Sequence, residues 1–161
     1  MAAVYEWSES NGVGQVITDS ISNLNFGSND SVNIVPATYP IDAGNNSFEK
    51  LIRAKFSGVT FTSISNMKFW KSAGGYKVGE SIKAIANQAY VQPVVTTSIL
   101  AVSSVPESEG TALSIQEAGG VTGIISAPGY TKYLVLQLQT TGSTPAGAVN
   151  QKTFTFQYDE V

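Results

Sequence analysis

Histidine and cysteine are both missing from this chain of 161 residues. Their absence excludes Ser-His-Asp triads, Cys-His nucleophiles and ordinary zinc sites, and it removes the commonest general base near neutral pH. Without cysteine no disulfide can form, so the composition says nothing about redox compartment. Only carboxylate or serine–lysine chemistry survives this exclusion. We therefore expect a protein that is not an enzyme and that holds no metal and no cofactor.

Charge is also scarce, because charged residues make up 13% of the chain, about half the usual share. The net charge of −3 does not provide the basic face that nucleic acids require. No apolar run approaches the length of a membrane span, and the first residues lack the basic and apolar regions of a signal peptide. Neither nucleic acid nor a membrane is an expected partner. The low charge fits an ordinary β-protein surface or one that packs against copies or partners, since interface cores are depleted in charged residues.

Alternation of apolar and polar residues in three segments predicts β-strands. The apolar residues that share a face are Ile52, Ala54 and Phe56 in the first segment, Leu134, Leu136 and Leu138 in the second, and Phe154, Phe156 and Tyr158 in the third. Weaker strand patterns and turn-forming Gly, Asn and Pro residues fill the remainder at the spacing of a sandwich or barrel. We expect an all-β chain that forms one antiparallel β-sandwich over residues 1–161, either immunoglobulin-like or a jelly roll.

Two segments leave the local structure open. Residues 80–89 fit a short helix and a strand equally well, because Ile82, Ala84 and Ala86 suit a strand while Ile82, Ile85 and Ala89 suit a helical face. Residues 1–14 are aromatic and polar and are interrupted by a turn-forming Asn-Gly pair. We interpret them as an extended N-terminal arm that reaches a neighbouring protein.

Aromatic residues supply the candidate interface, since exposed aromatic side chains mark protein contacts or sugar platforms. Phe69 and Trp70 point to opposite faces of one predicted strand, so one of them should face outward; alternatively, Trp70 caps the core. Tyr5 and Trp7 share a face in the predicted arm. The residues that we expect to contact a partner are Tyr5, Trp7, Asn11, Phe69 and Trp70.

Close pairs of acidic residues are the one feature that suggests catalysis, because glycosidases use two carboxyl groups. The pairs are Glu6 with Glu9, Glu107 with Glu109, and Asp159 with Glu160. All lie near a terminus or in a predicted polar loop, where burial would not raise a carboxyl pKa. We expect solvated surface acids, with a glycosidase as the competing interpretation.

Several runs of residues stand out as motifs. They are residues 5–12 (YEWSESNG), 25–28 (NFGS), 39–41 (YPI), 43–50 (AGNNSFEK), 64–71 (ISNMKFWK) and 153–160 (TFTFQYDE). Together these runs resemble small virion structural proteins of bacteriophages, of the head decoration (cement) type. The likeness covers most of the chain, but its motifs are structural and carry over no catalytic residue.

The resemblance implies a small β-rich domain that binds the outside of a phage head, as a dimer or trimer, and stabilises contacts between capsomers. The implied partner is the major capsid protein, and the implied location is the capsid exterior of the virion. The alternative is a tail- or fibre-associated module, or a carbohydrate-binding β-sandwich that uses Trp70 or Trp7 to stack on sugars.

Overall fold

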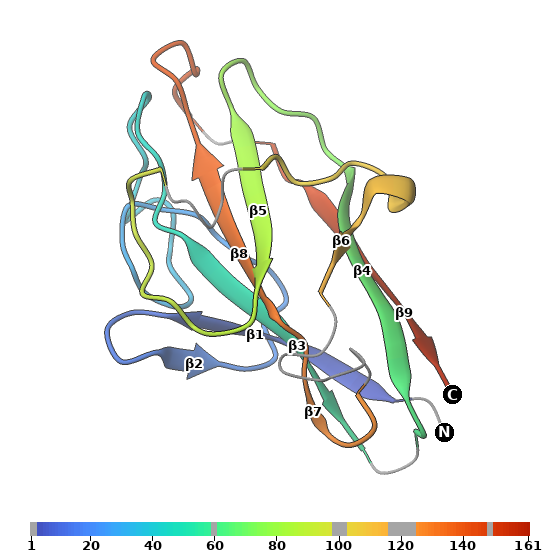
Figure 1. Cartoon of the computed structure of the whole chain (residues 1–161). Coiled ribbons are helices and arrows are strands. Elements are labelled where there is room, and N and C mark those ends of the chain that lie inside the picture. Colours follow the sequence, from blue (N-terminus) through green and yellow to red (C-terminus); the bar gives the residue numbers. More distant parts are fainter. Residues whose placement is uncertain (1–2, 59–60, 98–102, 116–124, 148–149) are drawn as a thin grey trace.

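Two antiparallel sheets make up the computed structural model, which describes residues 3–58, 61–97, 103–115, 125–147 and 150–161 (Figure 1). The strands are β1 (Val4–Asn11), β2 (Val16–Thr18), β3 (Lys50–Ser57), β4 (Ile64–Ala73), β5 (Ser81–Asn87), β6 (Leu113–Ser114), β7 (Gly129–Tyr130), β8 (Tyr133–Gln139) and β9 (Thr153–Glu160). The helical content of the described residues is one 3-10 turn, η1 (Glu109–Thr111). The expected all-β sandwich is confirmed.

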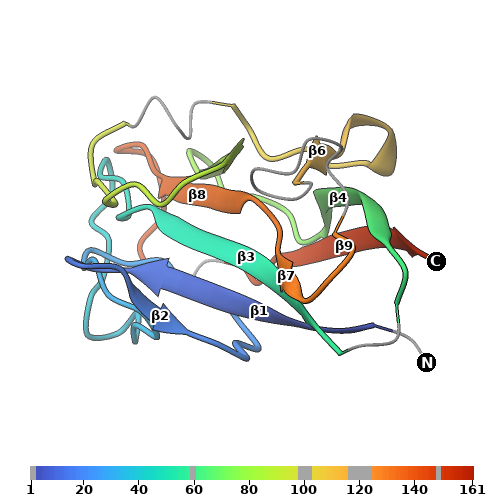
Figure 2. The ribbon, with the colours of Figure 1, turned by 60° about the horizontal axis from the view of Figure 1, so that its bottom comes forward.

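The larger sheet, sheet A, has the strand order β2-β1-β3-β8-β5, with the short β7 beside the end of β3. The smaller sheet, sheet B, has the order β6-β4-β9. The main hydrophobic core lies between the two sheets, which are seen as separate layers in Figure 2. Strands that are distant in sequence are neighbours in both sheets, as with β3 and β8 or β4 and β9.

The predicted alternation is confirmed in β3, β8 and β9. Ile52, Ala54 and Phe56 enter the main core together with the leucines of β8, and the aromatic residues of β9 pack against it. The opposite face of sheet A is also covered, because Leu51, Tyr133 and Val135 form a second cluster under Ile85 and Tyr90. The segment that follows β5 therefore lies over this face.

Residues 80–89 do not form a helix. Ser81–Asn87 is strand β5, which pairs with β8 along its whole length, from Ser81 with Gln139 to Asn87 with Tyr133. Ile82 and Ala84 are buried on the core side of the sheet. The local spacing of apolar residues fits a helix and a strand equally well, so it does not decide between them. Pairing with β8 along the whole segment favours the strand.

In the predicted arm of residues 1–14, the described residues 3–14 are not free of the domain either. Val4–Asn11 is strand β1, which pairs with β3 from Val4 with Ser57 to Ser10 with Leu51 and with β2 on its other side. Residues Ser8 to Asn11 are buried. The N-terminal segment is therefore an internal strand of sheet A, and the turn at Gly12 connects it to β2 rather than separating it from the domain.

Candidate functional site

An aromatic cluster fills the space between β1 of sheet A and β9 of sheet B. Tyr5 lies 5.4 Å from Phe156 and 5.7 Å from Tyr158, measured between ring centroids. Trp7 lies 5.2 Å from Phe156, and most of these contacts are edge-to-face, the arrangement that the charge distribution of aromatic rings favours. Tyr5 remains 40% exposed, so the cluster reaches the protein surface at this point.

Two of the predicted interface residues belong to the interior of this cluster. Phe69 is 2% exposed, stacks on Phe154 at 5.2 Å and meets Trp7 edge-to-face at 6.0 Å. Trp7 is half-buried and packs against the main core. Phe69 is too deeply buried to contact a partner, so its prediction as a partner contact was wrong, whereas that of Trp7 stays a prediction. Their aromatic character serves to join the two sheets.

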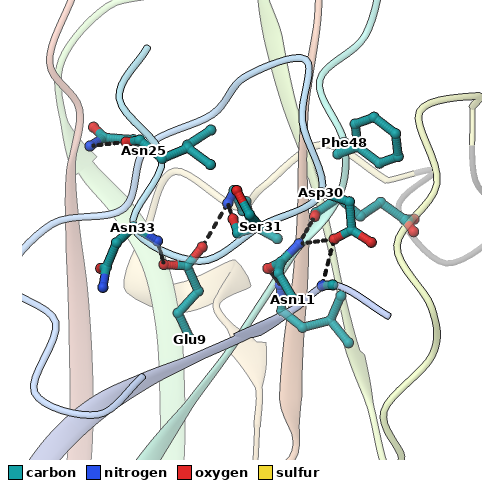
Figure 3. Close-up of polar contacts among 12 residues, drawn as sticks. Glu9, Asn11, Asn25, Asp30, Ser31, Asn33 and Phe48 are labelled. Carbon is teal, nitrogen blue, oxygen red and sulfur yellow. Dashed lines mark hydrogen bonds and ion pairs between the residues drawn. The ribbon is translucent and has the colours of Figure 1, made fainter. Parts of the chain in front are cut away.

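Asn11 is also structural. Its amide donates to Asp30 Oδ1 at 2.9 Å and to the Glu49 carbonyl at 2.7 Å, and its side-chain oxygen accepts from the Leu51 N–H at 3.4 Å. The Gly12 N–H donates to the same Asp30 oxygen (Figure 3). The Asn11 side chain is fully buried. It fixes the long segment between β2 and β3 onto sheet A, and a partner does not reach it.

Beside Asn11 lies a buried ion pair that the sequence did not predict. The Lys50 ammonium is 2.7 Å from Glu9 Oε1, and the two side chains are 0% and 2% exposed. Lys50 also donates to the Ser31 carbonyl at 2.6 Å, and the second Glu9 oxygen accepts from the Asn33 N–H at 3.1 Å (Figure 3). Glu9 is thus not the solvated surface acid that we expected. Its partner Lys50 begins strand β3, whose first three residues, Lys50 to Ile52, are all buried.

The other acidic pairs from the sequence have separate partners rather than a shared site. Glu107 lies 3.2 Å from the Lys71 ammonium, and Glu109 lies 3.8 Å from that of Lys68. The third pair, at the C-terminal end of β9, also has separate partners. Asp159 accepts a hydrogen bond from the Asn66 side chain, and Glu160 accepts one from the Ala3 N–H. In none of these contacts do the two carboxyl groups of a pair face one another.

An exposed cluster of charges lies on the outer face of sheet A. The Lys55 ammonium is 3.0 Å from Glu6 and 2.7 Å from Asp19. A hydrogen bond from Ser20, followed by one from Lys55, lowers the pKa of Glu6. Lys55, followed by Ser8, lowers the pKa of Asp19, and both carboxylates raise the pKa of Lys55. These charges satisfy one another and leave little for a charged partner.

Trp70 points away from the core. It follows the buried Phe69 and precedes the buried Lys71 on β4, so its side chain lies on the outer face of sheet B, opposite Thr155 of β9. Trp70 is partly exposed, to the same intermediate degree as Trp7, and among the described aromatic residues it takes no part in the ring contacts of the cluster. The prediction that either Phe69 or Trp70 faces outward is confirmed, and the residue is Trp70.

Tyr5 and Trp70 approach the same strand from its two faces. Tyr5 contacts Phe156 and Tyr158 on the inner face of β9, and Trp70 lies beside Thr155 on the outer face. We call Tyr5, Trp70 and strand β9 together the β9 margin. In Figure 1, β9 lies at the outer margin of sheet B, with β4 on its other side. The β9 margin is the candidate interaction surface.

A polar pocket of about 460 Å³ lies near β1 and β2. Its lining includes Glu9, Asp19, Asn23, Asn25 and Asn33. Glu9 is held by Lys50, and Asp19 by Lys55 and Ser8, so both acids are already engaged. In the described segments no three acidic side chains converge as a metal site would require. Those segments also contain no helix that could cross a membrane.

Comparison with models of protein families, with curated proteins and with solved structures finds no match to this chain. The β9 margin and the sequence motifs are the features of this chain that bear on its function.

Proposed function

We propose that this protein is a non-catalytic virion structural protein that decorates the outside of a phage head and stabilises contacts between capsomers. Its partner is the major capsid protein, and its location is the capsid exterior. The motifs in residues 5–12, 43–50, 64–71 and 153–160 support the proposal through their resemblance to head decoration proteins. Three of these motifs contribute to the β9 margin: Tyr5 from the first, Trp70 from the third, and β9 itself from the last.

The outward Trp70 is the observation that carries the proposal. Interfaces are enriched in tryptophan and depleted in lysine and acidic residues, and a few aromatic anchors supply most of their binding energy. Around Trp70 the outer face of sheet B presents Thr155 and Gln157 from β9. Lys68, the nearest charge on the same face of β4, is engaged by Glu109. An outer face with few charges and one large aromatic side chain suits a close contact with a shell.

The test is to count this chain against the major capsid protein in purified particles by quantitative mass spectrometry. Decoration of the shell predicts hundreds of copies per particle, whereas a handful of copies would indicate a tail or fibre component. Absence of the chain from particles would contradict the virion role. Readdition of Trp70→Ala to stripped particles should give reduced occupancy, while Tyr39→Ala, which removes an exposed aromatic residue elsewhere, should leave occupancy unchanged.

A carbohydrate-binding module is the second candidate, and the same residue favours it. An indole exposed on a sheet surface among hydroxyl and amide groups suits stacking on a sugar ring with polar contacts at its edge. A glycan array separates the two functions. A specific hit that is lost in Trp70→Ala would favour sugar binding, and the same array without hits would favour the shell.

A further inference from the structure

The edges of the two sheets differ in how well they are covered. Strand β2 is only three residues long and β6 only two. The outer edge of β5 is occupied, because the Ala84 N–H donates to the Ser103 carbonyl and the Val105 N–H donates to Ile82. Strand β9 has eight residues, and among the described residues no strand pairs with its second edge. An unpaired edge of this length is a template for another strand.

Hydrogen bonding within sheet B identifies the backbone groups that lie on this edge. The Lys71 N–H donates to the Pro106 carbonyl, on the β6 side of β4. Because backbone groups of successive residues point to opposite edges, Trp70 directs its own groups to β9, where it pairs with Thr155. The backbone N–H and C=O of Thr155 are therefore directed at β4, within sheet B. The backbone groups directed to the free edge belong to Phe154, Phe156 and Tyr158.

We propose that β9 of one chain pairs antiparallel with β9 of a second copy, so that two copies of sheet B become one six-stranded sheet. The contact has two-fold symmetry, with Phe156 opposite the partner's Phe156. This centre pairs residues of the same face, as a continuous pleated sheet requires. The other neighbours across the junction are Phe154 with the partner's Tyr158, and Thr155 with the partner's Gln157.

The side chains of β9 are complementary to themselves in this register. Aromatic residues meet aromatic residues on the inner face, and a hydroxyl meets an amide on the outer face; both are favourable cross-strand pairs. The acids at the C-terminal end, Asp159 and Glu160, lie beside the partner's Thr153 and the partner's Lys152, not beside the partner's acids. A shift by two residues in one direction places Phe154 opposite the partner's Glu160. A shift of the register by one residue would place the partner's inner aromatic side chains on the outer face of the joined sheet.

The half-buried state of the β9 aromatic residues gives an independent reason for the pairing. Phe154, Phe156 and Tyr158 pack against the core on one side, yet all three keep intermediate exposure. A second copy of β9 would cover them with equivalent rings. Burial of this kind is the usual source of stability in two-fold contacts between identical chains.

The dimer itself does not depend on the capsid role. If that role is correct, pairing through β9 has a further consequence, which rests on the proposed function. Trp70 lies on the outer face next to Thr155, so the joined sheet would present two Trp70 side chains on one surface. Two linked anchors bind a shell more tightly than either alone, because the second contact forms within the same complex.

The test uses the free full-length protein and needs no particle. Sedimentation equilibrium should give twice the mass of the chain at high micromolar concentration. In Thr155→Glu/Gln157→Glu, acids face acids at two positions of the junction, and we expect dimerisation to weaken by about tenfold or more. The matched variant Thr155→Lys/Gln157→Glu changes the same positions but places opposite charges together, and it should dimerise at least as well as the unchanged chain.

Amide hydrogen exchange gives a second readout that does not depend on any variant. The N–H groups of Phe154, Phe156 and Tyr158 should gain protection as concentration rises, while those of Thr155 and Gln157 are protected already. A chain that stays monomeric at high micromolar concentration would overturn the proposal. So would equal dimerisation of the two charge variants. Dimers of a chain that is absent from particles would overturn the capsid role alone.

Discussion

Strands β1 and β9 look alike in sequence but have different places in the fold. Both have eight residues and carry aromatic side chains at alternate positions, Tyr5 and Trp7 in one and Phe154, Phe156 and Tyr158 in the other. Strand β1 is paired with β3 from Val4 to Ser10 and on its other edge with β2 from Glu9 to Asn11, and its second half is buried. Strand β9 is paired on one edge and keeps every residue at least partly exposed.

The difference lies in what covers each strand. Residues 19–49 pass over β1, and Asn11, Asp30, Glu9 and Lys50 hold this segment in place through buried hydrogen bonds and an ion pair. No comparable set of contacts covers β9 in the described part of the chain. In the described residues, buried polar contacts therefore cover one end of β1, whereas every residue of β9 stays at least partly exposed.

Removal of β1 is the harshest way to test this comparison. An arm would tolerate deletion of residues 2–14, but an internal strand would not, since β3 would lose its partner and Phe56 and Phe156 would lose the rings of Tyr5 and Trp7. We expect the truncated chain to lose its cooperative unfolding transition, measured by circular dichroism. A folded truncated protein would show that the first strand is an arm after all.

The buried ion pair beside β1 should give the largest effect of a single substitution. In Lys50→Ala the Glu9 carboxylate stays buried without its cation, and loss of one partner of a buried pair destabilises a protein by about 3–5 kcal/mol. Urea unfolding measures the change. The matched control is Lys55→Ala, which removes an exposed lysine from two acids and should leave the unfolding midpoint almost unchanged.

Similar midpoints for the two lysine variants would contradict the interpretation of β1 as a strand specified by buried charge. Replacement of both members, Glu9→Gln with Lys50→Met, should recover part of the loss, because it leaves no unpaired charge in the interior.

Sequence periodicity predicted which residues share a face, but it could not predict which strands are neighbours. Ile52, Leu136 and Phe156 lie on the core side as expected, because alternation alone determines their side of a strand. Glu9 and Asn11 were misassigned because their burial depends on Asp30, Ser31 and Asn33, which lie in a segment without regular structure. Neither residue propensity nor apolar periodicity predicts where an irregular segment packs or which strand it buries.

The candidate site was predicted in part for the same reason. Trp70 and Phe69 had to face opposite sides, and that much follows from the strand geometry. Trp7 and Tyr5 share a face as expected. This face is directed at Phe156 of β9, which lies 149 residues after Trp7 and 151 residues after Tyr5 in the chain. Long-range pairing of this kind leaves no local signal in the sequence.

Aromatic residues on the two faces of sheet B should differ in their effect on stability. Phe156→Ala removes a ring that contacts Tyr5, Trp7 and Phe56, and we expect a loss of about 2 kcal/mol because the side chain is half-buried. Trp70→Ala removes a larger ring from the outer face and should cost less than half as much. Thermal unfolding of the two variants in parallel provides the measurement, and a greater loss for Trp70→Ala would mean that Trp70 belongs to the core.

The smallest expected effect concerns the exposed charges on the outer face of β1 and β3. The carboxyl pKa values of Glu6 and Asp19 lie below their ordinary values in the folded protein. Their contribution to stability is thus present above the pKa values of the unfolded chain and is lost as pH falls through the folded values. Lys55 has the opposite sign: its pKa is raised, so its contribution is present below the pKa of the unfolded chain and is lost only as pH rises through the folded value.

The two carboxylates should respond differently to loss of their partners, because their largest influences differ. A hydrogen bond from Lys55 is the largest for Asp19, whereas one from Ser20 is the largest for Glu6. NMR titration of the side-chain carboxyl groups should show that Lys55→Ala raises the pKa of Asp19 more than that of Glu6, and that Ser20→Ala raises the pKa of Glu6 alone. Equal shifts in both variants would indicate that general charge, rather than the individual hydrogen bonds, governs this surface. Because Glu6, Asp19 and Lys55 are open to solvent, salt should screen their charges, so both pKa shifts should shrink when the same titration is repeated at high ionic strength.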